Sequence, residues 1–178
     1  LYNNSPGIEA GSASFNNPAD LVIISNNLVH NNGTGITASS NVLVDGNIVY
    51  AQTGANNLGI NVTGNGEARN NVVYDNYTGI GGSGIARGNR VFHNTVNGIS
   101  MGAGALIEGN ITYDNGGAGI YGANLPNNAT RGPWIRNNLV YRNGTYGIQL
   151  QGGADSDVTN NTVYQPAGLG GVYIQNGN

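Results

Sequence analysis

The stretch RNNLVYRNGTYGIQL, residues 136–150, decides the fold of this chain. It holds a short apolar run after two Asn residues, then a polar turn, then a Gly-Ile step that opens a second short run. The phrase recurs along the chain, and each recurrence places an Asn at the position of Asn138. These anchor residues are Asn27, Asn47, Asn71, Asn89, Asn110, Asn138 and Asn161. Successive anchors are 18 to 28 residues apart, a spacing that predicts a solenoid of stacked turns.

A second series of residues repeats in phase with the anchors. Each member is an aliphatic residue that follows Gly: Ile8, Ile36, Ile60, Ile80, Ile99, Ile120, Ile148 and Val172. Two series in phase strengthen the prediction of a solenoid, and the longer one indicates about eight rungs. Each rung has room for three short strands separated by turns, and none contains a helical period of useful length.

The residues around each anchor define the expected turn and interior. The residue just before the anchor is always Gly or Asn, the types that tolerate a left-handed backbone, so we expect a turn there. Stacked anchor amides carry donors and an acceptor, so they can bond to each other and to the turn backbone. Positions such as Ile135 and Val140 carry small or β-branched residues in the other rungs, which suits a narrow interior lined by sheets.

These columns predict an all-β fold. We expect a right-handed single-stranded parallel β-helix of about eight rungs, with three short strands per rung and internal Asn ladders. Residues 1–178 form a single solenoid in this prediction. Because residue 1 already lies inside a repeat, we expect the sequence to be a segment of a longer chain. Its ends would then carry flanking domains or stack end to end with other copies.

Two further columns follow each anchor. Three residues after it stand His30, Tyr50, Tyr74, Phe92, Tyr113, Tyr141 and Tyr164. Five residues after it stand Asn32, Asn76, Asn94, Asn115 and Asn143, with Gln52 and Pro166 as exceptions. The first column predicts an aromatic stripe along the rod, and the second predicts another Asn ladder that is broken in two places.

Composition excludes several classes of protein. The chain has no Cys and no Lys, and its formal net charge is −3, so it carries neither a disulfide framework nor a basic nucleic-acid footprint. No apolar run is long enough for a membrane span. The 32 Asn and 31 Gly residues also suit a disordered low-complexity tract, but regularly placed Val and Ile and scarce charge argue against disorder.

The repeat also resembles that of a known family. The phrase at 137–148 resembles the repeat of right-handed parallel β-helix proteins of the pectate-lyase-like superfamily, and the resemblance covers essentially the whole chain. That superfamily includes lyases, hydrolases, epimerases, phage tailspikes and surface proteins, so the resemblance implies the fold and not one activity. The sequence departs from its enzymes in having no Lys, no Asp-Asp pair of the polygalacturonase kind and no Asp-Pro-His run of the alginate-epimerase kind.

Candidate catalytic residues lie four positions after the anchor. Four consecutive rungs place Asp75, His93, Asp114 and Arg142 in this column. Rungs about 4.8 Å apart would separate the two Asp residues by roughly 10 Å, near the upper limit for an inverting carboxylate pair. His93 could act as a base, and Arg142 could neutralise the carboxylate of an acidic sugar. The alternative is a solvated turn column in which opposite charges reduce repulsion along the rod.

Candidate substrate-binding residues gather near the C-terminal rungs: Arg131, Trp134, Arg136, Asp155 and Asp157. A single Trp beside carboxylates and Arg suits sugar stacking, and the alternative is a Trp that shields a loop. Residues 152–157, GGADSD, faintly resemble the calcium-binding nonapeptide repeat, but one copy supplies too few oxygen ligands. We therefore expect no cofactor and no metal, with calcium as the only ion that the sequence suggests.

Other surface columns carry weaker signals. The column two positions before the anchor, from Asp45 to Arg136, mostly alternates in charge, which indicates pairing on an exposed face. The face after the Gly-Ile step is polar and nearly uncharged, and it contributes Tyr121 as a further substrate-binding candidate. Long insertions at 9–21 and 121–133 could line a binding face or be neutral loops.

Two functions follow from these observations. The first is an extracellular β-helix that binds or processes a polysaccharide as a lyase, hydrolase or epimerase would, with a glycan as partner. The second is a non-catalytic segment of a surface protein, adhesin, stalk or filament, because open β-helix ends expose unpaired backbone groups. Both readings place the protein outside the cell, at the cell surface or in the periplasm.

Overall fold

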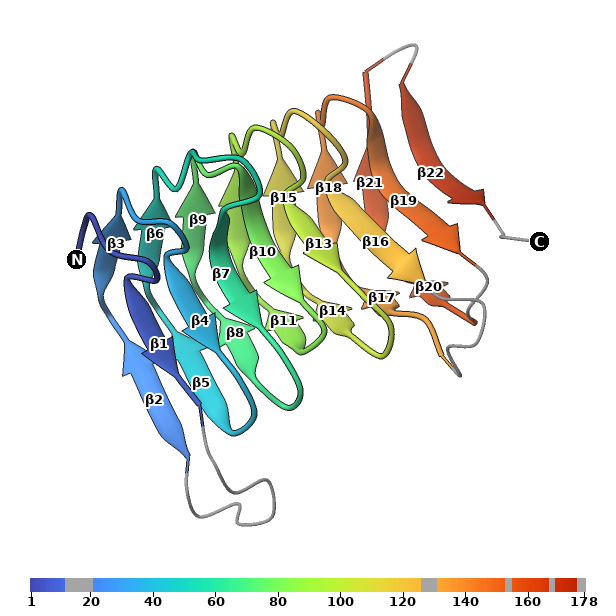
Figure 1. Cartoon of the computed structure of the whole chain (residues 1–178). Helices are drawn as coiled ribbons and strands as arrows, with labels where there is room; N and C mark the ends of the chain where they lie inside the picture. Colours follow the sequence, from blue (N-terminus) through green and yellow to red (C-terminus); the bar gives the residue numbers. More distant parts are fainter. Residues whose placement is uncertain (12–20, 126–130, 153–154, 167–168, 176–178) are drawn as a thin grey trace.

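The chain winds into a parallel β-solenoid whose turns lie side by side along one axis (Figure 1). The structure is a computed structural model, and it describes residues 1–11, 21–125, 131–152, 155–166 and 169–175. In each turn the chain passes through three parallel sheets, named here A, B and C in chain order. No helix in the described residues is long and apolar enough to cross a membrane.

Sheet A contains eight strands and sheets B and C contain seven each, within the described ranges. The strands of sheet A are β1 (Ile8–Ala10), β4 (Ile36–Ala38), β7 (Leu58–Val62), β10 (Thr78–Gly82), β13 (Ile99–Met101), β16 (Ile120–Leu125), β19 (Tyr146–Gly152) and β22 (Gly170–Gln175). Those of sheet B are β2 (Val22–Ser25), β5 (Val42–Asp45), β8 (Glu67–Arg69), β11 (Ile85–Arg87), β14 (Leu106–Glu108), β17 (Trp134–Arg136) and β20 (Asp157–Thr159). Those of sheet C are β3 (Leu28–His30), β6 (Ile48–Tyr50), β9 (Val72–Tyr74), β12 (Arg90–Phe92), β15 (Ile111–Tyr113), β18 (Leu139–Tyr141) and β21 (Thr162–Tyr164).

Strand register confirms the alignment read from the sequence. The Gly-Ile series pairs directly from turn to turn, as in Ile60 beside Ile80 and Ile80 beside Ile99. The three-strand rung and the parallel pairing are confirmed as well. The rung count is slightly wrong: with seven strands each in sheets B and C, the described solenoid has fewer than eight complete turns. The eighth Gly-aliphatic step contributes only β22 of sheet A, so counting one series overstated the number of complete rungs.

The core is a column of aliphatic side chains from all three sheets. Sheet A contributes the Ile of the Gly-Ile step and sheet C the Val two positions after the anchor, both buried in the middle turns. Burial of each such side chain stabilises the fold by roughly 1.5–3 kcal/mol. Thr112 replaces Val in this column; it is fully buried, and its hydroxyl has no hydrogen-bond partner among the residues that the structure describes.

The anchor Asn residues form a continuous ladder. In the middle of it, Asn89 Oδ1 accepts from the backbone N–H and the side-chain amide of Asn71, at 3.0 and 2.9 Å. Asn89 Nδ2 donates to Ala68 O at 2.9 Å and to Asn110 Oδ1 at 3.0 Å. Buried amides left without partners would cost several kcal/mol in an apolar interior, so the ladder explains why the column holds one residue type.

The second ladder is also present, and it is less broken than predicted. Gln52 takes a regular place in it, with Oε1 accepting from the Asn32 backbone at 2.7 Å. The exception at Pro166 is resolved by Gln165, whose Oε1 accepts from the Asn143 backbone at 2.9 Å. Gln165 stands four positions after its anchor, in the column that carries the charged residues in other turns. Its longer side chain nevertheless reaches the position that Asn fills elsewhere, so Gln165 belongs to the ladder.

Left-handed backbone occurs in two columns, of which the sequence predicts one. The predicted column, before the anchor, has positive φ throughout: Asn26, Gly46, Asn70, Gly88, Gly109, Asn137 and Asn160. The second lies four positions after the anchor: Asn31, Ala51, Asp75, His93, Asp114 and Arg142, with φ between 51° and 61°. The charged line is thus a turn column, and at Arg142 its backbone is in a region that is unfavourable for that residue type.

The Gly of the Gly-Ile step is required by close packing. A Cβ added at Gly79 would lie 2.5 Å from the Gly98 carbonyl oxygen and 2.5 Å from Cγ1 of Val91. It would also lie 2.9 Å from Nδ2 of Asn94, in the second ladder. At this Gly, one turn packs directly against the backbone, the core side chain and the ladder amide of the next turn.

The aromatic column forms a stack on the outer side of sheet C. It runs through Tyr2, His30, Tyr50, Tyr74, Phe92, Tyr113 and Tyr141, with neighbouring ring centroids 4.9–5.7 Å apart. The interplanar angles are 19° or less, so each ring covers the face of the next. The predicted stripe is confirmed from His30 to Tyr141.

Candidate functional site

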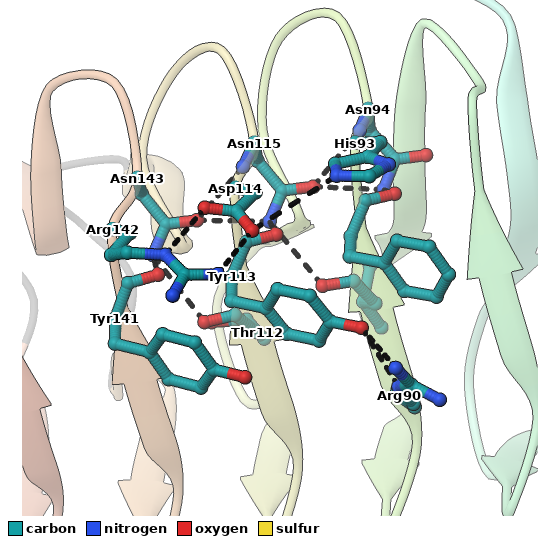
Figure 2. A network of polar contacts seen from close by, with 12 residues as sticks. Arg90, His93, Asn94, Thr112, Tyr113, Asp114, Asn115, Tyr141, Arg142 and Asn143 are labelled. Carbon is teal, nitrogen blue, oxygen red and sulfur yellow. Dashed lines mark hydrogen bonds and ion pairs between the residues drawn. The ribbon is translucent and has the colours of Figure 1, made fainter.

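The charged line lies along the turns that follow sheet C. Figure 2 shows His93, Asp114 and Arg142 in successive turns, beside the second Asn ladder. Arg142 donates from Nε to Asp114 Oδ1 at 2.9 Å and from Nη2 of its guanidinium to Oδ2 at 2.6 Å, a bidentate pair. His93 Nε2 lies 4.0 Å from Asp114 Oδ2. The register therefore brings together three of the four predicted catalytic residues.

Asp75, the fourth residue of the line, is exposed, and no hydrogen bond or ion pair of its side chain occurs in the part of the chain that the structure describes. The Arg142 guanidinium, by its hydrogen bonds, holds the pKa of the Asp114 carboxyl below its ordinary value. Asp114 is consequently an ionised, paired carboxylate near neutral pH, and an acid role for it would require breaking this pair.

The outer side of sheet B carries a line of ion pairs. Asp45 pairs with Arg69 at 3.0 Å. Further along the rod, Arg87 lies between Glu67 at 3.3 Å and Glu108 at 3.0 Å. Glu108 also accepts from Arg136 at 2.8 Å, and this hydrogen bond is the largest cause of the lowered pKa of its carboxyl. The predicted cross-strand pairing on this face is confirmed, with Glu67 added from the neighbouring column.

A hollow of about 280 Å³ opens at the C-terminal end of sheet B. Its lining residues are Arg131, Trp134, Asp155, Ser156 and Asp157. A second hollow of about 200 Å³ adjoins it and shares three of these residues, with Arg136 and Thr159 added. The five residues that the sequence groups around Trp134 therefore meet in one place.

Backbone pairing builds the first hollow. Trp134 lies in register with Asp157 on the next turn, and Asp157 N–H donates to Pro133 O at 3.2 Å. The Gly132 N–H donates to the Asp155 carbonyl. The strands β17 and β20 thus fix Trp134 above Asp157, while the adjacent loop segment carries Arg131.

Side-chain contacts leave the two carboxylates of this hollow unpaired. The guanidinium carbon of Arg131 lies 4.0 Å from the centre of the Trp134 ring, so it covers one face of the indole. In the described residues, neither Asp155 nor Asp157 makes a side-chain hydrogen bond or ion pair, and no second aromatic or cationic group lies on Trp134. The hollow therefore presents an aromatic ring, one guanidinium and two free carboxylates.

Tyr121 lies outside this group. It belongs to β16 of sheet A, and its hydroxyl donates to Gln151 Oε1 at 2.6 Å. The structure places it on the face after the Gly-Ile step, as the sequence indicates, and apart from the Trp134 hollow of sheet B. A further hollow of about 250 Å³, lined by Gly144, Thr145, Tyr146, Leu169 and Gly170, was not predicted; the pairing of Tyr146 with Gly170 could have indicated it.

Part of the sequence predictions falls outside the described residues. The calcium-like segment 152–157 contains residues 153–154, and the insertions at 9–21 and 121–133 contain residues 12–20 and 126–130, which the structure does not describe. Among the described residues, no three His, Asp or Glu side chains are grouped so as to hold a metal ion.

Comparison with known protein families matches residues 99–178 to the family described as right handed beta helix region. This match covers less than half of the chain, and the three parallel sheets with their Asn ladders extend the same architecture over the described residues. The fold is that of a right-handed parallel β-helix repeat protein. No curated protein and no solved structure matches the chain.

Proposed function

We propose that the protein binds carbohydrate outside the cell, through the hollow that contains Trp134. One observation carries the proposal: an indole ring lies in a concave surface beside Arg131 and two unpaired carboxylates. Sugar rings bind proteins by stacking an apolar face on an aromatic ring while polar side chains hold their hydroxyls. The Trp134 hollow offers both kinds of group.

The aromatic stack of sheet C is a poorer place for stacking a sugar. Its rings lie 4.9–5.7 Å apart and nearly parallel, so neighbouring rings cover each other's faces. A pyranose approaching from solvent would meet ring edges there. Trp134 stands outside that stack and has Arg131 over one face of its ring. The indole is therefore the favoured surface for stacking a sugar ring.

The size of the hollows indicates the size of the bound unit. Volumes of about 280 and 200 Å³ lie below the roughly 300–1,000 Å³ of pockets that enclose a whole drug-sized ligand. Each hollow can therefore hold about one sugar unit. A polymer that bound here would insert one or two units and run on over the surface.

A binding assay with Trp134→Ala tests the proposal. Retardation of the protein in gels containing soluble polysaccharides should reveal one that slows the native chain, and the variant should migrate freely in it. Tyr164→Ala, which removes another exposed aromatic ring (65% exposed), should be retarded like the native protein. If no polysaccharide retards the native protein, or if Trp134→Ala is retarded equally, the proposal fails.

Polysaccharide cleavage at Asp75, His93, Asp114 and Arg142 stays a prediction. The contact of His93 with Asp114 at 4.0 Å supports it, and the bidentate pairing of Asp114 with Arg142 argues against an acid role for Asp114. Degradation assays on uronic-acid polymers test it. Any cleavage that depends on this line should disappear in His93→Ala and persist in Trp134→Ala at saturating polymer.

The second candidate function is a structural one, as a segment of a surface protein or filament. It is favoured by the charged columns, since most of their members pair with each other along the rod, as Glu108 does with Arg87 and Arg136. Light scattering distinguishes this candidate: a self-assembling subunit should grow in mass with concentration. A monomer that still binds polysaccharide through Trp134 would contradict it.

A further inference from the structure

We infer that the carbohydrate bound at the Trp134 hollow carries free amino groups, as in a polymer of de-N-acetylated amino sugars. This inference rests on the proposed carbohydrate-binding function and adds to it the charge of the ligand. Its basis is the balance of charges around the indole, which favours a cation over the acidic sugars that many extracellular polysaccharides contain.

The carboxylates of Asp155 and Asp157 are the uncompensated charges of the hollow. Both residues are exposed, both line the 280 Å³ hollow, and neither side chain takes part in an ion pair or hydrogen bond among the described residues. Asp157 also lines the adjoining hollow, directly beneath Trp134 in the strand register. A positive group placed over the indole would thus have carboxylates beside it.

The nearby guanidinium groups are already engaged. Arg136 lines the second hollow but donates to Glu108 at 2.8 Å, and Glu108 is shared with Arg87, which also contacts Glu67. This chain of two acids and two bases is neutral as a unit. Arg131 is the one cation left beside the indole, against the two carboxylates, so the hollow has an excess of one negative charge.

An acidic sugar would find little to bind elsewhere on the described surface. The chain has six basic residues, all Arg. Four of them pair with carboxylates, at Arg69, Arg87, Arg136 and Arg142. Arg90 lies over the rings of Phe92 and Tyr113 and donates to the Tyr113 hydroxyl, on sheet C and two turns before the turn that contains Trp134. A uronate at Trp134 would instead bring a third carboxylate towards Asp155 and Asp157.

The recognition chemistry follows from these contacts. The sugar ring stacks on the part of the indole that stays exposed beside Arg131, and an ammonium group of the sugar donates to Asp157 and Asp155. Exposed ion pairs add modestly to affinity, so two of them should give a preference of about tenfold for the amino sugar over its N-acetylated form. The preference should shrink as salt is added, because exposed charges are screened.

Calorimetric titration with matched oligosaccharides tests the inference. The probes are a β-linked glucosamine oligosaccharide, its fully N-acetylated counterpart of the same length, and an oligogalacturonate. They are compared under mildly acidic conditions, where the amine of the glucosamine probe is protonated. The native protein should bind the first about tenfold more tightly than the second and the third most weakly.

Variants separate charge recognition from carbohydrate binding. Asp155→Asn combined with Asp157→Asn should remove most of the tenfold preference while the N-acetylated probe binds as before. Glu9→Gln, which neutralises an exposed carboxylate on β1 at the other end of the rod, should keep the preference.

Two outcomes would overturn the inference, and they differ in what they leave standing. Equal binding of the charged and N-acetylated probes, or tighter binding of the galacturonate, would overturn the charge assignment and leave the proposed carbohydrate binding intact. Binding of none of these probes, nor of any polysaccharide in the retardation assay, would overturn both.

Discussion

Replacing Asn89 by Ala in the middle of the first ladder should be among the most destabilising single changes in the chain. The side chain is buried and makes four hydrogen bonds, two accepted from Asn71 and one donated to each of Ala68 and Asn110. At about 1 kcal/mol net for each bond, their loss should cost roughly 4 kcal/mol. The substitution also leaves the buried Asn71 N–H without its acceptor, and this unsatisfied donor adds to the loss of stability.

Urea denaturation followed by circular dichroism measures this cost. Asn27→Ala is the matched control, because the Asn27 side chain ends the ladder and makes two bonds, to Ser25 O and Asn47 Oδ1, in a partly exposed place. It should cost about 1–2 kcal/mol. If the two variants lose equal stability, or if Asn89→Ala loses less than about 1 kcal/mol, the ladder does not stabilise the fold as argued.

Three further changes test other parts of the structure. Thr112→Val should stabilise the protein by about 1 kcal/mol in the same urea assay, because it removes a buried hydroxyl that has no partner in the described part of the chain; destabilisation would mean that the hydroxyl is bonded. Gly79→Ala should cost about 2 kcal/mol or more through overpacking, whereas Gly104→Ala, with open space around it and a φ of 74°, should cost about 1 kcal/mol from backbone strain alone; equal costs would contradict the packing argument. The pKa of the Asp114 carboxyl is lowered by Arg142, so its contribution to stability is complete above the unfolded pKa near 3.9 and is lost as the pH falls through the folded value. The urea concentration at the unfolding midpoint should therefore decrease when the pH is lowered below about 4, and it should decrease less in Arg142→Gln. A pH profile of Arg142→Gln identical to that of the native protein would contradict the assignment.

The fold could be predicted almost completely from the sequence, because its physical requirements repeat. Each turn needs a left-handed residue before the anchor, a ladder amide at the anchor, and a Gly where one turn touches the next. Asn137, Asn138 and Gly147 meet these requirements in the opening phrase. Because every turn has the same requirements, the same residue types recur at the same positions of the repeat. The strand register therefore agrees with the alignment of the repeats.

The irregular positions could not be predicted in the same way. Gln165 stands one residue before the expected ladder position, and only its longer side chain restores the ladder. The left-handed backbone at Ala51 and Arg142 was missed because neither residue type signals it. In both cases three-dimensional contacts override the local preference of the residue.

The Trp134 hollow was predicted in part. Trp134 and Asp157 share a column, so the sequence places them in adjacent turns. Tyr121 lies on sheet A, where the Gly-Ile series places it, and so stands apart from the Trp134 hollow of sheet B. The stacking of Arg131 on the indole depends on side-chain conformation in a loop, which no column encodes.

Fluorescence of Trp134 during glycan titration tests the central claim most directly. Trp134 is the only Trp in the chain, so any change in indole emission reports on this hollow alone. Carbohydrate binding at the hollow predicts a saturable change in emission with a glucosamine oligosaccharide, of lower affinity in Asp155→Asn combined with Asp157→Asn. Emission that stays constant while calorimetry records binding would place the glycan elsewhere and contradict the account.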